Sequence, residues 1–328
     1  MKKIMKRFSI SLLTLLIVLI GSVYSFHKFK EHKETSLLEN NTGKLIDFNE
    51  KKINVYTEGQ GVDTFVFMAG SAVAAPIYEL KGLYRHFSKE NTIAVVERAG
   101  YGYSDEFSDD RDIDVILQQT REALMNSGNK PPYILVPHSI SGIEAIYWAQ
   151  KYPNEVKAIV ALDIGLPSQY IKHPIGFAEK MFTKAGNVLS ELGFQRIMPT
   201  LAYNETVLEK DFLTSKEKEI FKAISNKHGI NNDMVQEVLQ SVVNSEKSTA
   251  LPIPKTTPIL FIDAYLDKNS AAAKESLKDY QDFAKQLDAS SVIQIKSSHS
   301  IYLYHPTEIY KETQKFLQET VENKLERN

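Results

Sequence analysis

The feature that most constrains this fold is a repeated alternation between short apolar runs and helical patterns. Apolar runs of this length that end in glycine, proline or a polar turn are typical of strands buried on both faces. They occur at residues 64–70, 91–100, 133–137, 156–164, 257–264 and 291–296. Helical periodicity separates them at 76–88, 113–127, 140–152, 270–287 and 306–323. Strand and helix in alternation predict βαβ units, a mostly parallel sheet, and a ligand site beyond the carboxyl ends of the strands.

Two segments depart from this alternation. Residues 44–61 contain two short alternating runs around Asn49 and Glu50, which predict a hairpin that brings the sheet to eight strands. Residues 165–254 contain helical patterns without a buried-strand run. We therefore predict an α/β core over 44–164 and 255–328, with a helical cap at 165–254 inserted after the sixth strand.

The first residues carry a targeting signal. The start, MKKIMKR, is basic, and residues 8–26 contain no charged side chain, which is enough to span a bilayer. Residues 1–26 are therefore a membrane anchor or a cleaved secretory signal, with Val23 and Ser25 at an acceptable cleavage position. Basic residues at the start favour a cytoplasmic N-terminus and a body outside the cell membrane, or a secreted body if the signal is cleaved. Residues 27–43 are polar and are expected to form a linker.

Composition excludes several classes of function. The chain of 328 residues has no cysteine, which rules out a thiol nucleophile, a thiolate metal site, disulfides and a lipoprotein anchor. Its formal net charge of -2 gives no general attraction to nucleic acid. His173, His228 and His305 lack the spacing of metal ligands, so we expect no metal and no cofactor.

Four short segments follow one another in an informative order. They are FVFMAGSA (65–72), ERAGYGYSD (97–105), LVPHSISG (135–142) and SSHSIYLYHPTEI (297–309). Together they resemble the α/β-hydrolase fold family, in its serine hydrolase branch with a helical cap. The third segment resembles that family's nucleophile elbow, with Pro137 and Ser141 at the usual glycine positions. Ala69 replaces a histidine of the first segment, and Glu97 replaces an aspartate of the second.

The resemblance implies an acyl-transfer site. Ser139 would be the nucleophile, His299 its general base, and the backbone N–H groups of Ile140 and Ser71 the oxyanion hole. His138 is expected to shape the turn, and Arg98 to pair with Glu97. A serine at the elbow argues against the branches with an aspartate nucleophile, such as dehalogenases and epoxide hydrolases.

The acid of the triad has two candidates. In PILFIDAYLD (258–267), the family pattern places the acid at Asp267, and this is our assignment. Some branches take the acid from the end of the preceding strand, where Asp163 lies. Alternatively, Asp267 only caps the helix that follows it. In the same way, Asp163 alternatively forms a hydrogen bond with the start of the 165–254 insertion.

The expected activity is hydrolysis of a small-molecule carboxylic ester through an acyl-enzyme. The alternatives are a peptidase or amidase of the same fold, or a non-catalytic surface protein that binds a ligand. Tyr101, Tyr103, Phe177 and Met181 are expected to line the substrate pocket. Five apolar residues of the cap predict an apolar acyl or alcohol site: Phe177, Met181, Phe182, Leu189 and Phe194. Alternatively, these residues only pack the helices of the cap onto the sheet.

Overall fold

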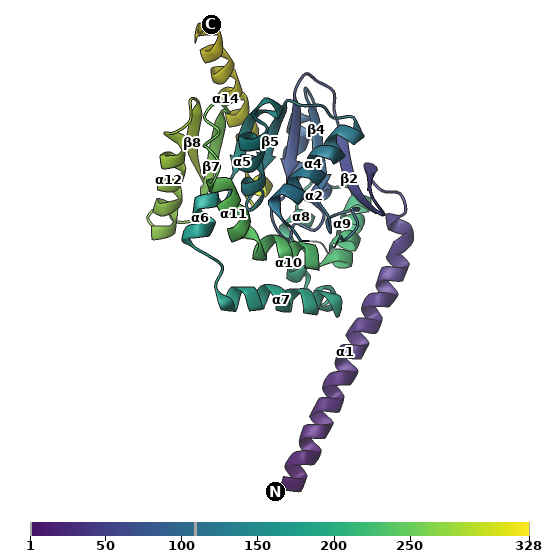
Figure 1. Ribbon diagram of the computed structural model, residues 1–328. Helices are drawn as coiled ribbons and strands as arrows, with labels where there is room; N and C mark the ends of the chain where they lie inside the picture. The colour runs from purple at the N-terminus through teal and green to yellow at the C-terminus, as the bar shows by residue number, and fades with distance from the viewer. Residues whose placement is uncertain (1, 108–109, 328) are drawn as a thin grey trace.

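The sheet has the predicted mixed topology (Figure 1). The computed structural model describes residues 2–107 and 110–327. In these residues eight strands form one sheet in the order β1-β2-β4-β3-β5-β6-β7-β8. Their bounds are β1 (Lys44–Phe48), β2 (Lys51–Glu58), β3 (Thr64–Met68), β4 (Thr92–Glu97), β5 (Tyr133–Pro137), β6 (Val156–Leu162), β7 (Ile259–Tyr265) and β8 (Ser290–Lys296). The β1–β2 hairpin turns at Asn49, and β4 to β8 are parallel to β3.

Helices cover both faces of the sheet because successive strand side chains point to opposite sides. Phe65 and Phe67 of β3 belong to one buried cluster, whereas Val66 and Met68 belong to the other. The first face is covered by α2 (Pro76–Glu79), α3 (Lys81–Phe87), α13 (Ile301–Tyr304) and α14 (Pro306–Arg327). The second is covered by α4 (Ile113–Ser127), α5 (Ser141–Lys151) and α12 (Ala271–Ala284).

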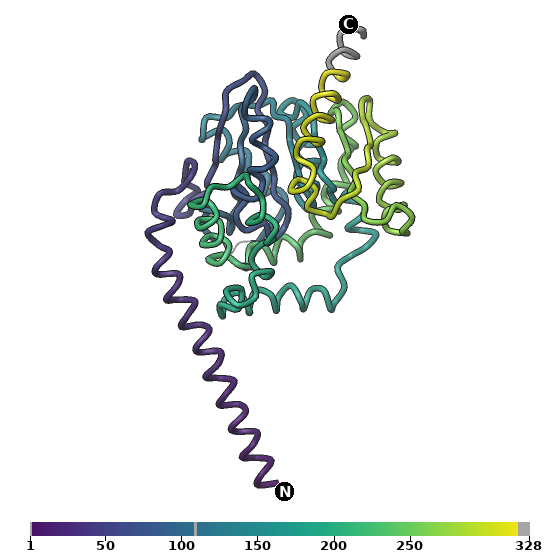
Figure 2. The backbone as a smooth tube through the Cα atoms, turned by 180° about the vertical axis from the view of Figure 1, so that it is seen from behind, coloured from purple at the N-terminus to yellow at the C-terminus, as the bar shows by residue number. Residues whose placement is uncertain are grey.

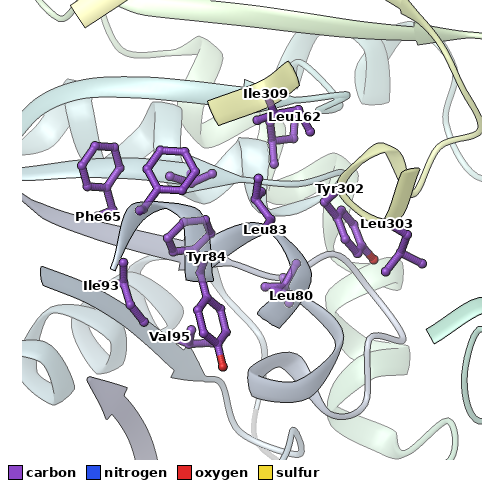
Figure 3. Close-up of a cluster of buried hydrophobic side chains, with 14 of the residues drawn as sticks. Phe65, Leu80, Leu83, Tyr84, Ile93, Val95, Leu162, Tyr302, Leu303 and Ile309 are labelled. Carbon is purple, nitrogen blue, oxygen red and sulfur yellow. The ribbon is translucent and has the colours of Figure 1, made fainter. Parts of the chain in front are cut away.

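Figure 3 shows part of the first cluster, where strand and helix side chains interlock. Phe65, Ile93 and Val95 come from the strands, and Leu83 and Tyr84 from α3. Tyr302 and Leu303 lie beside Leu80 in the same view, so α13 is held against the core directly after His299.

The segment between β6 and β7 is helical and lies at the carboxyl ends of the strands (Figure 1). It comprises α6 (Pro167–Lys172), α7 (Phe177–Glu191), η2 (Phe194–Arg196), η3 (Pro199–Leu201), α8 (Thr206–Glu209), α9 (Ser215–His228), α10 (Asn232–Leu239) and α11 (Ser241–Thr249). Arg98, which follows β4, donates to both carboxylate oxygens of Glu237 on α10, at 2.9 and 3.0 Å. The expected pairing of Arg98 with Glu97 is therefore wrong. Glu97 instead accepts from Asn54 and from the Tyr103 N–H.

The N-terminal residues form one long helix, α1 (Lys2–Leu38). It is long and apolar enough to cross a membrane, judged by length and composition. The structure continues this helix through Leu38, into the residues for which we expected a linker. The helix is held to the body there, because Arg196 donates to His27 Nδ1 at 3.0 Å and to Glu34 at 2.9 and 2.7 Å.

Candidate active site

Ser139 occupies a strained turn between β5 and α5. Its φ of 57° lies in the left-handed region, which non-glycine residues rarely adopt and which concentrates at functional sites. Two glycines allow the backbones to meet there. A Cβ on Gly70 would lie 2.7 Å from His138 Nδ1, and one on Gly142 would lie 2.6 Å from Ile164 Cβ. Ser139 therefore projects from a tight junction of strand and helix.

The two departures from the usual elbow glycines fit this turn. Pro137 is the last residue of β5 and pairs with Met68 at the end of the β3–β5 ladder. Ser141 Oγ accepts from the His138 N–H at 2.9 Å. It also lies 2.9 Å from the Met68 carbonyl and 2.8 Å from the His138 carbonyl, and donates to one of them. The hydroxyl of Ser141 thus lies within hydrogen-bond distance of backbone groups of both the elbow and β3.

His299 lies in the loop after β8 and is paired with an acid. Its Nδ1 is 2.6 Å from Asp163 Oδ2. Asp163 directly follows β6 with a φ of 45°, and its other oxygen accepts the Ala264 N–H at 3.0 Å. The second hydrogen bond fixes the carboxylate, so the imidazole is held through Nδ1 with its Nε2 free for other partners.

Asp267, our first assignment for the acid, lies elsewhere. It is exposed beyond the end of β7, and its Oδ1 accepts the Asn269 N–H at 2.9 Å. This turn leads into α12, whose N-cap is Ser270. The aspartate that contacts His299 is therefore Asp163, our second candidate, because β7 continues through Tyr265 and carries Asp267 into the turn that starts the next helix.

The buried His138 side chain contacts the loop that carries His299. Its Nε2 donates to the His299 carbonyl at 2.9 Å, and its ring centre lies 4.6 Å from that of His299 and 4.9 Å from that of Tyr302. Burial, together with the neighbouring His299, lowers the pKa of His138 to about 3. His138 is therefore a neutral donor at physiological pH, which suits a residue that positions the loop.

Two backbone N–H groups belong to residues close to Ser139, since Ile140 follows it in the chain and Ser71 lines the same cavity. The N–H groups of Ser71 and Ile140, expected to form the oxyanion hole, have no hydrogen-bond partner among the described residues. Ala72, next to Ser71, is left-handed with a φ of 60°. Ala72, Ser139 and Asp163 thus place three strained non-glycine residues after three neighbouring strands, β3, β5 and β6.

Ser139 and His299 line one cavity of about 600 Å³. Two buried side chains of this cavity, absent from the sequence assignment, form a pair: the Tyr302 hydroxyl donates to Glu79 Oε1 at 2.7 Å. Burial raises the pKa of Glu79 to about 7. The helical segment between β6 and β7 supplies most of the remaining wall. These wall residues are Thr200, Leu201, Ala202, Tyr203, Asn204, Glu205, Thr206, Glu209 and Ile230.

Comparison with known proteins gives the family. The chain is 52% identical to the uncharacterized protein YbdG of Bacillus subtilis over 317 residues, which cover 96% of this chain and 97% of that protein. This chain belongs to the YbdG family. No protein-family model matches it.

Solved structures give the fold. A laboratory-evolved variant of potato epoxide hydrolase superposes with a TM-score of 0.64 at 16% identity, over 85% of this chain and 100% of that one. A haloalkane dehalogenase variant from Bradyrhizobium elkanii gives 0.60 at 16%, over 87% and 99%. This YbdG relative therefore has the α/β-hydrolase fold, as the four sequence segments implied.

The four residues expected to line the substrate pocket do not line the cavity of this YbdG relative. Tyr101 is buried and its hydroxyl donates to Glu237 Oε2 at 2.8 Å. The Tyr103 hydroxyl is 2.9 Å from that of Tyr78. Phe177 and Met181 are exposed on α7. The sequence analysis did not assign Tyr302 and Glu79 to the cavity. Tyr302 could have been found from its position three residues after His299, whereas no sequence pattern indicated Glu79.

Proposed function

We propose that this protein is a serine hydrolase that cleaves carboxylic esters through an acyl-enzyme. The observation that supports the proposal best is the arrangement of three residues. Ser139 is strained at an elbow, shares a cavity with His299, and His299 is hydrogen-bonded to Asp163. A serine hydroxyl is a weak nucleophile at neutral pH and requires such an adjacent, oriented base.

The roles follow from these contacts. Nε2 of His299 takes the proton of Ser139 as Oγ attacks the ester carbonyl, and then gives it to the departing alcohol. Asp163 keeps the Nδ1 proton of His299 in place and stabilises the imidazolium. Water, activated by the same imidazole, then attacks the acyl-enzyme and releases the acid and Ser139.

The negative charge on the tetrahedral oxygen requires donors that are already in place. The backbone N–H groups of Ile140 and Ser71 are our candidates, because neither has a hydrogen-bond partner in the described part of the chain. Ile140 follows Ser139 in sequence, and Ser71 lines the same cavity. The N-terminus of α5 begins at Ser141, so its dipole adds favourable positive potential.

We place this activity at the outer face of the cell membrane. The basic start of α1 and its apolar stretch support an anchor with an extracytoplasmic body. Cleavage after Ser25 would instead release a secreted body.

Labelling with a fluorophosphonate probe tests the proposal. We expect the full-length protein to be labelled and Ser139→Ala to remain unlabelled. Ser300→Ala, a second serine of the same cavity, is the matched control and should retain labelling. Unlabelled, well-folded wild-type protein would support the ligand-binding alternative. If the wild-type protein is labelled, rates on matched ester and anilide substrates separate an esterase from an amidase.

A further inference from the structure

The outermost helix of the segment between β6 and β7, α7, has an unusual distribution of apolar residues. Phe177 is 82% exposed and Phe182 is 78% exposed, and Met181 and Val188 are also exposed. We call Phe177, Met181 and Val188 the α7 surface. A soluble protein rarely exposes so many large apolar side chains together, and such a patch marks an interaction site.

Helical geometry shows that this surface faces away from the body. Gly186 and Ser190 are the buried positions of α7 and lie on one side, one turn apart. Ser190 Oγ accepts the Ile230 N–H at 3.0 Å, so this side packs on the segment before α10. At 100° per residue, Phe177, Met181 and Val188 lie on the opposite side. The apolar stripe of this amphipathic helix is therefore directed outward.

The C-terminal end of α7 lies where α1 leaves the body. Gly193, two residues after the end of α7, has a φ of 89°, and a Cβ there would lie 2.3 Å from His27 Cβ. The uncharged stretch of α1, residues 8–26, ends next to this contact. Figures 1 and 2 show α7 lying across the direction of α1, which continues past it away from the body.

We infer that the α7 surface lies in the interface of the lipid bilayer that α1 enters. A bilayer that encloses residues 8–26 would have its surface level with His27, and hence with α7. Amphipathic helices bind in this orientation, with apolar side chains among the acyl chains and lysines reaching the headgroups. Lys180 and Lys184 are both exposed on α7 and supply such cations. The inference concerns membrane contact and does not depend on the proposed hydrolase activity.

The absence of cysteine makes a direct test possible, because each introduced cysteine carries the only thiol label. Met181→Cys and Val188→Cys are labelled with an environment-sensitive fluorophore in the full chain. The protein is reconstituted in phosphatidylcholine–phosphatidylglycerol vesicles. We expect blue-shifted emission, and quenching by brominated phosphatidylcholine several-fold stronger than at either control position.

Two control positions distinguish insertion of the α7 surface into the bilayer from a position that is merely close to the bilayer. Val62→Cys replaces a fully exposed apolar residue before β3, at the edge of the sheet opposite the helical segment. Lys222→Cys lies on the exposed side of α9, a helix that packs against α1. Emission and quenching at 181 and 188 equal to those at 222 would overturn the inference. So would a blue shift without lipid quenching that disappears when labelled chain is diluted with unlabelled chain, because a second copy would then cover the surface.

Discussion

His299 Nδ1 lies 2.6 Å from Asp163 Oδ2, although the two residues are separated by 136 positions in the chain. The contact joins the loop after β8 to the turn after β6, across the carboxyl end of β7. The Ala264 N–H of β7 holds the other oxygen of Asp163. The central strand of this group, β7, therefore holds the Asp163 carboxylate that contacts His299.

Replacing Asp163 tests this contact. Asp163→Asn keeps the shape of the side chain but favours the wrong tautomer of His299, so kcat should fall by about three to four orders of magnitude. Asp267→Asn should leave kcat within about threefold, because the exposed Asp267 side chain accepts the Asn269 N–H and an asparagine oxygen can do the same. Ester hydrolysis by both purified variants, with circular dichroism to verify folding, makes the comparison. A large loss in Asp267→Asn with a normal rate in Asp163→Asn would reverse our assignment.

Ser141 should contribute to stability more than to chemistry. Ser141→Ala removes the hydroxyl that links the His138 N–H to the Met68 or His138 carbonyl. We expect a loss of about 1–2 kcal/mol in the free energy of unfolding, with kcat retained within a few-fold. Denaturant titration and fluorophosphonate labelling measure the two effects. Unchanged stability together with lost labelling would show that Ser141 acts in the reaction instead.

Glu79 should give the protein a pH-dependent stability. Burial raises its pKa from 4.5 to about 7, so the folded state binds the proton more tightly than the unfolded state. The stabilisation of the folded state that comes from this tighter proton binding is present in full below pH 4.5. It is lost as the pH rises through about 7. Glu79→Gln keeps an acceptor for Tyr302 and does not titrate.

The difference between wild type and Glu79→Gln isolates this effect. Between pH 4.5 and 8, wild type should lose up to about 3 kcal/mol relative to the variant. The pKa of Glu97, which burial also raises to about 7, affects both proteins equally and cancels. Urea unfolding at pH 5 and pH 8 measures the difference. A difference that stays constant across this range would contradict the assigned titration.

Local sequence patterns were sufficient for the frame and for two residues, Ser139 and His299, that the structure places at one cavity. The apolar runs predicted the strands, and α4 begins and ends at the predicted residues, Ile113 and Ser127. Ser139 and His299 were assigned because each lies in a short motif next to its strand. The acid could not be assigned in this way. Two aspartates follow neighbouring strands, and the choice depends on where β7 ends and on the left-handed turn at Asp163.

Side-chain direction was the other property that local patterns did not predict. The aromatic residues Tyr101 and Tyr103 resemble pocket residues in sequence, yet buried partners occupy both hydroxyls. The period of α7 revealed an apolar stripe, but period alone does not say whether the stripe faces a core, a cavity or a membrane. Only the packing of Gly186 and Ser190 shows that Phe177 points outward.

The cavity should discriminate against anionic esters. Glu205 and Glu209 both line it, and no lysine or arginine is among the described residues of its wall. Two carboxylates several Å from a negative acyl chain should disfavour it by about 1 kcal/mol at low salt. We therefore expect kcat/KM to be about fivefold lower for an acyl chain that ends in a carboxylate than for a matched chain that ends in a methyl group.

Neutralising the wall should remove this preference. In the double variant Glu205→Gln/Glu209→Gln the two substrates should react at similar rates, and in wild type added salt should reduce the difference because both glutamates are exposed. Glu90→Gln is the control, since it removes one negative charge at the opposite edge of the sheet, just before β4, and should keep the preference. Initial rates for both esters across a salt series measure the effect at pH 6, where Glu79 of the same cavity is mostly protonated. A preference that persists in the double variant and does not respond to salt would mean that cavity shape, and not the charge of Glu205 and Glu209, selects the acyl chain.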